Sequence, residues 1–206
     1  MHFQLRDDFN PREAAAITGL NLKKVHHAIE RGPLRKAQKR AHKDSTSRLA
    51  IVDLLFLVAV AELGKEGLKL PTSVQHKLYS RLSAQLHNPG AGGRPLSPAL
   101  ELRRPIFIDS GYLMEILDAG IAKLLEARAR VVSDPDIMSG HPVFRGTRIP
   151  VHAIAEMMEQ GASAKEMRAG YPSLKAKDFD LALLYAQAYP ERGRPIERWR
   201  NPEASL

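Results

Sequence analysis

FNPREAAAITGLNLKKVHHAIERG, residues 9–32, is the stretch that decides the fold of the N-terminal part of the chain. Pro11 suits the first turn of a helix, and good helix formers follow it up to Gly19, which can adopt the positive φ that ends a helix. Asn21 can cap a second helix, which a Gly-Pro step stops. Two short helices joined by a turn of about three residues predict a helix-turn-helix.

The two faces of the second predicted helix differ in character. Val25, Ala28 and Ile29 form its inner face, and they match the small Ala15 where the first helix crosses and the apolar Leu20 in the turn. The outer face carries cations for phosphates and short polar groups for base edges, which suits the major groove of DNA. A helical hairpin with a solvated basic face is the alternative. We predict a DNA-binding surface that consists of Asn21, Lys23, Lys24, His26, His27, Arg31, Arg35, Lys36, Lys43 and Arg48.

Positive charge concentrates in the same region. Residues 1–48 contain eleven Lys and Arg against five Asp and Glu, and the whole chain carries a formal net charge of +8. A positive field over one end of a molecule favours a polyanion there, because each phosphate that a Lys or Arg neutralises releases condensed counterions.

Several classes of function are disfavoured by the composition. The chain has no cysteine, which removes disulfides, thiolate nucleophiles and zinc fingers. The eight histidines show no helical metal-binding spacing in an acidic setting, and no nucleophile, base and orienting acid stand in a plausible arrangement. We therefore expect neither an enzyme nor a protein that binds a metal or another cofactor.

No segment has the pattern of a membrane span or a targeting signal. The longest apolar run, residues 49–63, contains Asp53 and is too short for a bilayer, and the N-terminus lacks an apolar signal core. We expect a cytoplasmic protein. The run 49–63 predicts a buried helix instead, and residues 70–86 predict an amphipathic helix.

The middle of the chain predicts a boundary followed by a long helix. Glycine and proline gather in residues 87–98, and residues 105–108 are strand-like. A helix should then begin at Asp109 or Ser110 and run to Arg128. Its apolar stripe is wide enough to bury either against another domain of the chain, as part of the core, or against another subunit. The stripes of this helix and of a helix over residues 175–189 exceed what one small domain needs, so we predict that both contact a second subunit in a homodimer. The stripe consists of Leu113, Ile116, Leu117, Ile121, Leu124 and Leu125.

The segment SGHPVFRGTRIPVHAI, residues 139–154, predicts a hairpin rather than a phosphate site. Gly146 supplies the turn between Val143-Phe144 and residues 149–151, and a helix follows over 150–160. Ser163 and Glu166 form a capping box for a second helix, before the third over 175–189. Arg145 and Arg148 are expected to pair with Asp134, Asp136 or helix-end carbonyls.

Two resemblances extend this interpretation. REAAAITGL and VHHAIERGPLRKA resemble the opening of MerR-like winged-helix domains, with Arg48, Asp53 and Leu54 at matching positions and residues 41–47 as the candidate wing. The long coiled-coil helix of MerR regulators is absent, so no inducer pocket is implied.

Residues 131–190 resemble a small helical domain family of unknown function that contains a Gly-Thr-Arg-Ile-Pro-Val motif, here residues 146–151. Joined to a MerR-like N-terminus, this domain makes the chain similar to VapB-type antitoxins, which are paired with PIN-like ribonuclease toxins. The resemblance implies that an arginine of the tail blocks the toxin's acidic metal site. An aromatic residue beside arginines has the composition of an interface hot spot. The candidate toxin-binding residues are Arg192, Arg194, Arg198, Trp199 and Arg200.

The expected fold is mainly α, with an N-terminal winged helix-turn-helix and a C-terminal three-helix domain that has a short β-hairpin. The predicted organisation is a DNA-binding domain over 1–87, a linker over 88–104, a connecting strand and helix over 105–130, the small helical domain over 131–190 and an extended tail over 191–206. The expected function is that of an antitoxin that represses its own operator and neutralises a PIN-like nuclease. The alternative is a DNA-binding transcription regulator without a toxin partner.

Overall fold

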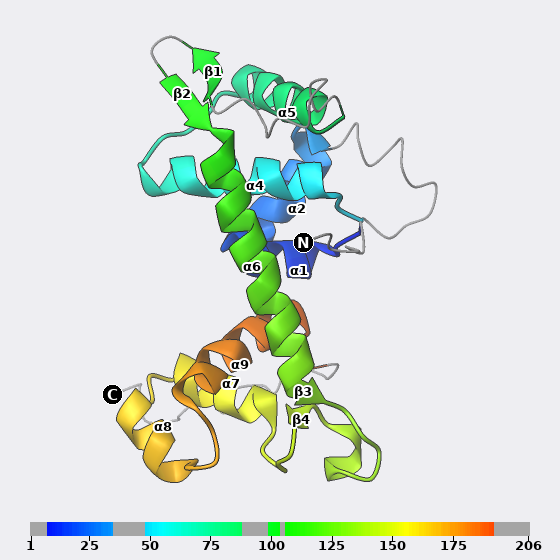
Figure 1. The fold of residues 1–206 in the computed structure, drawn as a ribbon, viewed down its shortest axis with the longest axis vertical. Coiled ribbons are helices and arrows are strands. Elements are labelled where there is room, and N and C mark those ends of the chain that lie inside the picture. The colour runs from blue at the N-terminus through cyan, green and yellow to red at the C-terminus, as the bar shows by residue number, and fades with distance from the viewer. Residues whose placement is uncertain (1–7, 35–47, 88–98, 104–105, 192–206) are drawn as a thin grey trace, which may run out of the picture.

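The computed structural model describes residues 8–34, 48–87, 99–103 and 106–191. The chain is mainly helical, as predicted, and forms two lobes that one long helix, α6 (Ser110–Arg130), connects. Figure 1 shows the N-terminal lobe above and the C-terminal lobe below, with α6 running past both. The candidate wing, residues 41–47, lies outside the described residues. None of the described helices is long and apolar enough to cross a membrane.

The predicted helix-turn-helix is present as α1 (Pro11–Thr18) and α2 (Leu22–Arg31). Gly19 ends α1 with a φ of 68°, a left-handed conformation that glycine adopts without steric cost. The Asn21 side chain accepts a hydrogen bond from the backbone N–H of Lys23 and so caps α2. A second cap, absent from the sequence-based prediction, begins α1, where Asn10 and Glu13 form a capping box.

Helices α4 (Ile51–Lys65) and α5 (Thr72–His87) complete the N-terminal lobe. α4 is buried on most sides, as its apolar run predicts, and α5 buries Leu78 and Leu82 against it. Asp53 is only 3% exposed, but its carboxylate accepts hydrogen bonds from the Ala50 N–H and the Tyr79 hydroxyl. The core of this lobe therefore accommodates one carboxylate by satisfying its hydrogen bonds.

A short antiparallel pair of strands leads into α6. Strand β1 (Ala99–Arg103) pairs with β2 (Ile106–Asp109), and Asp109 then caps α6 as predicted. β1 falls within the segment 88–104 that we expected to be a linker, so at least residues 99–103 of it form regular structure.

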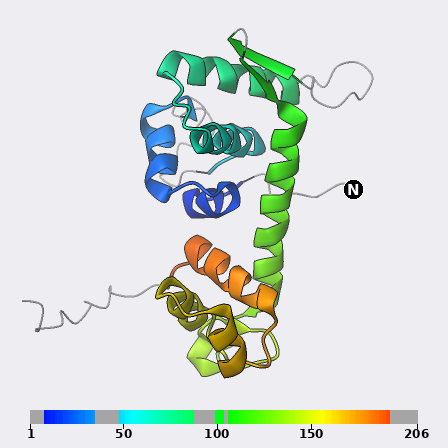
Figure 2. The same ribbon diagram turned by 90° about the vertical axis from the view of Figure 1, so that its left-hand side faces the viewer.

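The long helix α6 packs against the N-terminal lobe and the C-terminal lobe in turn (Figure 2). Leu113, Leu117, Ile121 and Leu124 are buried within the chain, whereas Leu125 is 39% exposed and does not belong to the covered stripe. α6 passes so close to α1 that a Cβ at Gly120 would clash with the carbonyl oxygen of Ile17.

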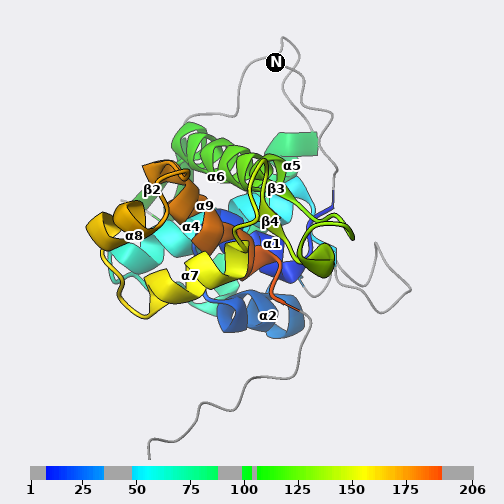
Figure 3. The same cartoon turned by 90° about the horizontal axis from the view of Figure 1, so that it is seen from below.

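The C-terminal lobe consists of short strands β3 (Val131–Val132) and β4 (Val143–Phe144), a 3-10 turn at Met138–Gly140, and helices α7 (Val151–Glu159), α8 (Ala164–Gly170) and α9 (Ala176–Ala188). α9 packs on α7 and also touches α6 and α1, so it lies between the N-terminal lobe and the rest of the C-terminal lobe (Figure 2). Seen from below, α7 and α9 lie side by side (Figure 3). Phe179 and Ala182 are buried in this packing. Most of the stripe of 111–128 is thus covered within one chain by α1, α4 and α9, and that of 175–189 by α7, α6 and α1. The homodimer contact through these two helices stays a prediction.

The predicted hairpin is present around Gly146, which has a φ of 78°. The Phe144 N–H donates to the Ile149 carbonyl, and Val143 forms a bridge with Pro150. The other edge of β4 pairs with β3, a contact the sequence did not predict. Ser163 and Glu166 form the predicted capping box at the start of α8.

Candidate nucleic-acid interface

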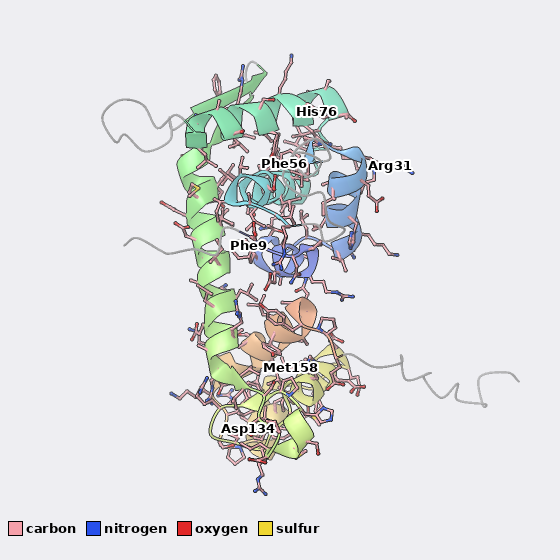
Figure 4. All side chains as sticks on the ribbon, turned by 90° about the vertical axis from the view of Figure 1, so that its right-hand side faces the viewer. Phe9, Arg31, Phe56, His76, Asp134 and Met158 are labelled. Atoms are coloured by element: carbon pink, nitrogen blue, oxygen red, sulfur yellow. The ribbon has the colours of Figure 1, made fainter. Side chains whose placement is uncertain are left out.

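Helix α2 forms an outer edge of the N-terminal lobe, on the side opposite α6 (Figure 4). Val25 and Ile29 turn inward and are 0% and 8% exposed. Figure 4 shows Arg31 directed away from the lobe at the end of the helix. The exposed face of α2 carries five of the predicted DNA-binding residues, which are Lys23, Lys24, His26, His27 and Arg31.

Asn21 is exposed, but its side-chain oxygen is occupied by the cap of α2. An oxygen that accepts a backbone N–H has less capacity left for a base edge. Asn21 therefore caps the helix, and its contact with DNA stays a prediction. The single acidic residue on the exposed face of α2 is Glu30, one turn beyond His26.

Arg48 is exposed at the end of the gap in the described chain and precedes Leu49. Leu49 and Phe9 exchange two backbone hydrogen bonds, of 2.9 Å and 2.8 Å, which hold this segment beside the start of α1. The other predicted DNA-binding residues, Arg35, Lys36 and Lys43, lie outside the described residues. The same is true of all the candidate toxin-binding residues, which are Arg192, Arg194, Arg198, Trp199 and Arg200.

The motif of residues 146–151 has a structural role in the described chain. The Thr147 hydroxyl donates to the Phe144 carbonyl and accepts the Ile149 N–H, which closes the turn. Arg145 donates from Nε to the carbonyl of Ala129 at 3.0 Å, so it pairs with a helix-end carbonyl, as predicted. Arg148 makes no hydrogen bond or ion pair with the described part of the chain.

An ion pair that the sequence did not predict ties α9 to the end of α6. Arg130 donates from Nε and Nη2 to the two carboxylate oxygens of Asp178, at 2.8 Å and 2.9 Å. The hydrogen bonds from Arg130 keep the pKa of Asp178 below its usual value. The same guanidinium donates to the Arg145 carbonyl, so one side chain joins α6, α9 and the hairpin.

A second unpredicted contact joins the last helical segment to the helix-turn-helix. The Tyr189 hydroxyl donates to Glu13 at 2.6 Å, and the other carboxylate oxygen of Glu13 accepts the Asn10 N–H. Burial, followed by the hydrogen bond to Glu13, raises the pKa of Tyr189. The C-terminal lobe thus contacts the cap of α1.

Among the described residues, no group of three or more His, Asp or Glu side chains is placed to hold a metal ion. His141 approaches Glu191 at 3.9 Å, and burial lowers the pKa of the nearby His152.

Comparison with known proteins identifies the C-terminal segment. Residues 131–186 match the family described as protein of unknown function, DUF433. The predicted resemblance of residues 131–190 to a small helical family of unknown function is thus confirmed for this segment. The resemblance of the N-terminal residues to MerR-like domains stays a prediction.

A curated relative and a solved structure are also similar to this chain. The relative is the uncharacterized protein y4eO of Sinorhizobium fredii (strain NBRC 101917 / NGR234), which is 48% identical over 83 residues. That match covers 40% of this chain and 38% of the relative, so the chain spans about two fifths of the relative's length. The X-ray crystal structure of Rv2018 from Mycobacterium tuberculosis aligns over 85% of this chain and 96% of that chain, with 14% identity and a TM-score of 0.34.

Proposed function

We propose that the protein binds double-stranded operator DNA through α2, represses its own operator and neutralises a PIN-like nuclease as an antitoxin. The observation that carries the proposal is the division of α2 into a buried apolar side and an exposed side with three Lys or Arg and two His residues. A helix with this division, held by a preceding helix at a tight turn, can enter a major groove.

The exposed residues of α2 suit two kinds of contact. Lys23, Lys24 and Arg31 supply cations for phosphates, which set affinity and register. His26 and His27 are shorter polar groups on the same face and suit base edges. Arg48 extends this basic surface from the segment beside α1.

The antitoxin part of the proposal rests on sequence resemblance. The combination of MerR-like and DUF433-like segments is similar to VapB-type antitoxins, and the Arg-rich tail is the segment proposed to hold the toxin. A transcription regulator without a toxin would use α2 in the same way. An adjacent reading frame that encodes a protein with Asp and Glu spaced between strands favours the antitoxin, and its absence favours the regulator.

The operator complex is proposed to be a homodimer, because one helix-turn-helix covers only one half-site and half-sites lie about 34 Å apart. α6 and α9 bury most of their stripes within the chain, which favours an additional surface for the contact with a second copy. Phe107 and Tyr112, which are 57% and 53% exposed where β2 meets α6, are apolar candidates for it. Light scattering that gives a monomer mass at micromolar concentration, with and without DNA, would exclude the dimer.

The test of DNA binding is a gel-shift salt series with the duplex upstream of the protein's own gene. Lys23→Ala combined with Lys24→Ala should weaken binding and flatten the salt dependence by about one unit of slope for each lost phosphate contact. The matched control is Lys123→Ala combined with Lys165→Ala, which removes the same charge from exposed positions on α6 and α8. If the two double variants weaken DNA binding equally, only the net charge of the protein matters and α2 is not the DNA-binding surface. If Lys23→Ala with Lys24→Ala leaves the affinity for DNA unchanged across the salt series, the proposal is refuted.

A further inference from the structure

A cavity of about 340 Å³ opens beside α2, between this helix and helices α4 and α5. Its volume is at the lower end of the roughly 300–1,000 Å³ that ligand pockets span. Leu20, Phe56 and Leu57 form its floor and are at most 6% exposed. In Figure 4, Phe56 lies inside the N-terminal lobe, between α2 and α6. The floor is therefore apolar and belongs to the packed core.

The rim of the cavity is cationic on the α2 side. Lys23, Lys24 and His27 line it and are exposed, and no residue that lines the cavity is acidic. On the α5 side, Gln75 donates from Nε2 to the Leu70 carbonyl at 2.8 Å, which fixes its side chain. Apolar contact at the floor and positive charge at the rim together favour a ligand with an apolar body and an anionic end.

We infer that this cavity binds a small organic anion, such as an aromatic or short-chain carboxylate or sulfonate, with the apolar body on Phe56 and Leu57 and the anionic group at Lys23 and Lys24. The occupant is small because the floor is closed by core side chains. A peptide or a second copy of the chain would need an extended apolar surface, whereas the exposed rim here is charged.

A ligand in this cavity would oppose DNA binding, a consequence that rests on the proposed function. The anion would occupy Lys23 and Lys24, which are the cations proposed to contact phosphates. The ligand and DNA would therefore compete, and by linkage each would weaken the binding of the other by the same factor. The cavity would then make DNA binding responsive to a metabolite of this chemical class.

The test of the cavity uses two fluorescent probes and does not depend on DNA. Anilinonaphthalene sulfonate has an apolar body and one negative charge, and phenylnaphthylamine is its uncharged counterpart. We expect saturable binding of the sulfonate to the full chain. Lys23→Ala with Lys24→Ala should weaken sulfonate binding about fivefold, since two exposed charges are lost, and should change binding of the neutral probe less than twofold. Lys123→Ala with Lys165→Ala is the matched control and should change neither.

A large side chain that fills the cavity should abolish binding of both probes. Val60→Trp fills it from α4, and Ala28→Met fills it from α2; both residues are half-buried and line the cavity. Circular dichroism and thermal melting establish that a variant is folded, and the second variant serves if the first does not fold. Tyr112→Ala removes an exposed aromatic side chain elsewhere and should leave probe binding unchanged. Binding that survives both filled variants, or that Tyr112→Ala abolishes, would overturn the inference.

Competition with DNA separates the two proposals. Saturating sulfonate should weaken binding of the upstream duplex to the native chain but not to a folded, cavity-filled variant. Sulfonate bound in the cavity with DNA affinity unchanged would overturn the regulatory part alone. If the upstream duplex does not bind the native chain at all, the proposed function is overturned. The fluorescence comparison would still show whether the cavity binds the sulfonate.

Discussion

Asp178 is a nearly buried acid, and its partners come from different parts of the chain. It is 3% exposed, both of its oxygens accept from Arg130, and one of them also accepts the Lys175 N–H at the start of α9. A charge in such a site is tolerated because its hydrogen bonds are satisfied. Asp178 therefore both caps α9 and fixes α9 to α6.

Replacing Asp178 by Asn should destabilise the fold by about 1–3 kcal/mol, because Arg130 loses a charged, two-point partner. The measurement is urea unfolding monitored by circular dichroism at neutral pH. Asp180→Asn is the matched control, because Asp180 lies two residues along the same helix and is exposed. It should change stability by less than about 0.5 kcal/mol. Equal losses of stability in Asp178→Asn and Asp180→Asn would show that the ion pair between Arg130 and Asp178 does not stabilise the fold.

The same residue predicts a pH dependence of stability. The pKa of Asp178 is lowered in the folded state, so its stabilising effect is present above the unfolded pKa of about 3.9 and disappears as the pH falls through the lower folded value. The stability difference between the native chain and Asp178→Asn should therefore be constant from pH 7 to about pH 5 and shrink below pH 4. A difference that persists unchanged at pH 2.5 would contradict this.

At the scale of elements, α6 and α1 are held at a distance that only glycine permits. A Cβ at Gly120 would overlap the Ile17 backbone carbonyl and touch the Ile17 side chain. Gly120→Ala should therefore destabilise the protein by about 1–3 kcal/mol, although alanine favours the helix. Gly64→Ala is the control, since Gly64 lies in the last turn of α4 with open space around it and a Cβ there should leave stability equal or slightly higher. Thermal melting distinguishes the two, and a stabilised Gly120→Ala would mean that the crossing is looser than described.

The elements that the sequence predicted are those specified by neighbouring residues. The Asn21 cap, the Gly19 stop and the Ser163 capping box each depend on residues within four positions, so the pattern contains the whole interaction. The buried and exposed sides of α2 follow from helical periodicity in the same way.

The contacts that position the lobes could not be predicted from local pattern. Arg130 and Asp178 are 48 residues apart, and Glu13 and Tyr189 are 176 apart. The apolar stripes of α6 and α9 were visible in the sequence, but periodicity gives a buried face without saying what covers it. Within the chain, most of the stripe of α6 packs on α1, α4 and α9, and that of α9 on α7, α6 and α1.

At the scale of the whole molecule, the two lobes are not independent modules joined by a linker. α6 contributes to the core of the N-terminal lobe and carries Arg130 at its other end, and α9 touches α1 as well as α7. The end of the C-terminal lobe, just beyond the segment that matches DUF433, therefore supports the helix-turn-helix directly, through Ala188 in the N-terminal core and Tyr189 on Glu13. A variant intended to separate DNA binding from toxin binding must leave this contact intact.

Truncation after Tyr189 meets that condition, because it keeps Tyr189 and removes the segment with Arg192, Arg194, Arg198, Trp199 and Arg200. If the tail holds the nuclease, the truncated chain should bind the upstream duplex as the full chain does but should no longer protect cells from the co-expressed toxin. Gel shift measures the first property, and growth on toxin induction measures the second.

A full chain with the four tail arginines changed to Gln keeps the length and tests the charge alone, since a guanidinium is needed to pair with metal-binding carboxylates. If the truncated chain inhibits the nuclease at equal stoichiometry, the inhibitory surface lies within residues 1–189 instead. If it loses both properties, residues 190–206 contribute to DNA binding as well, and the proposed division of roles between α2 and the tail is wrong.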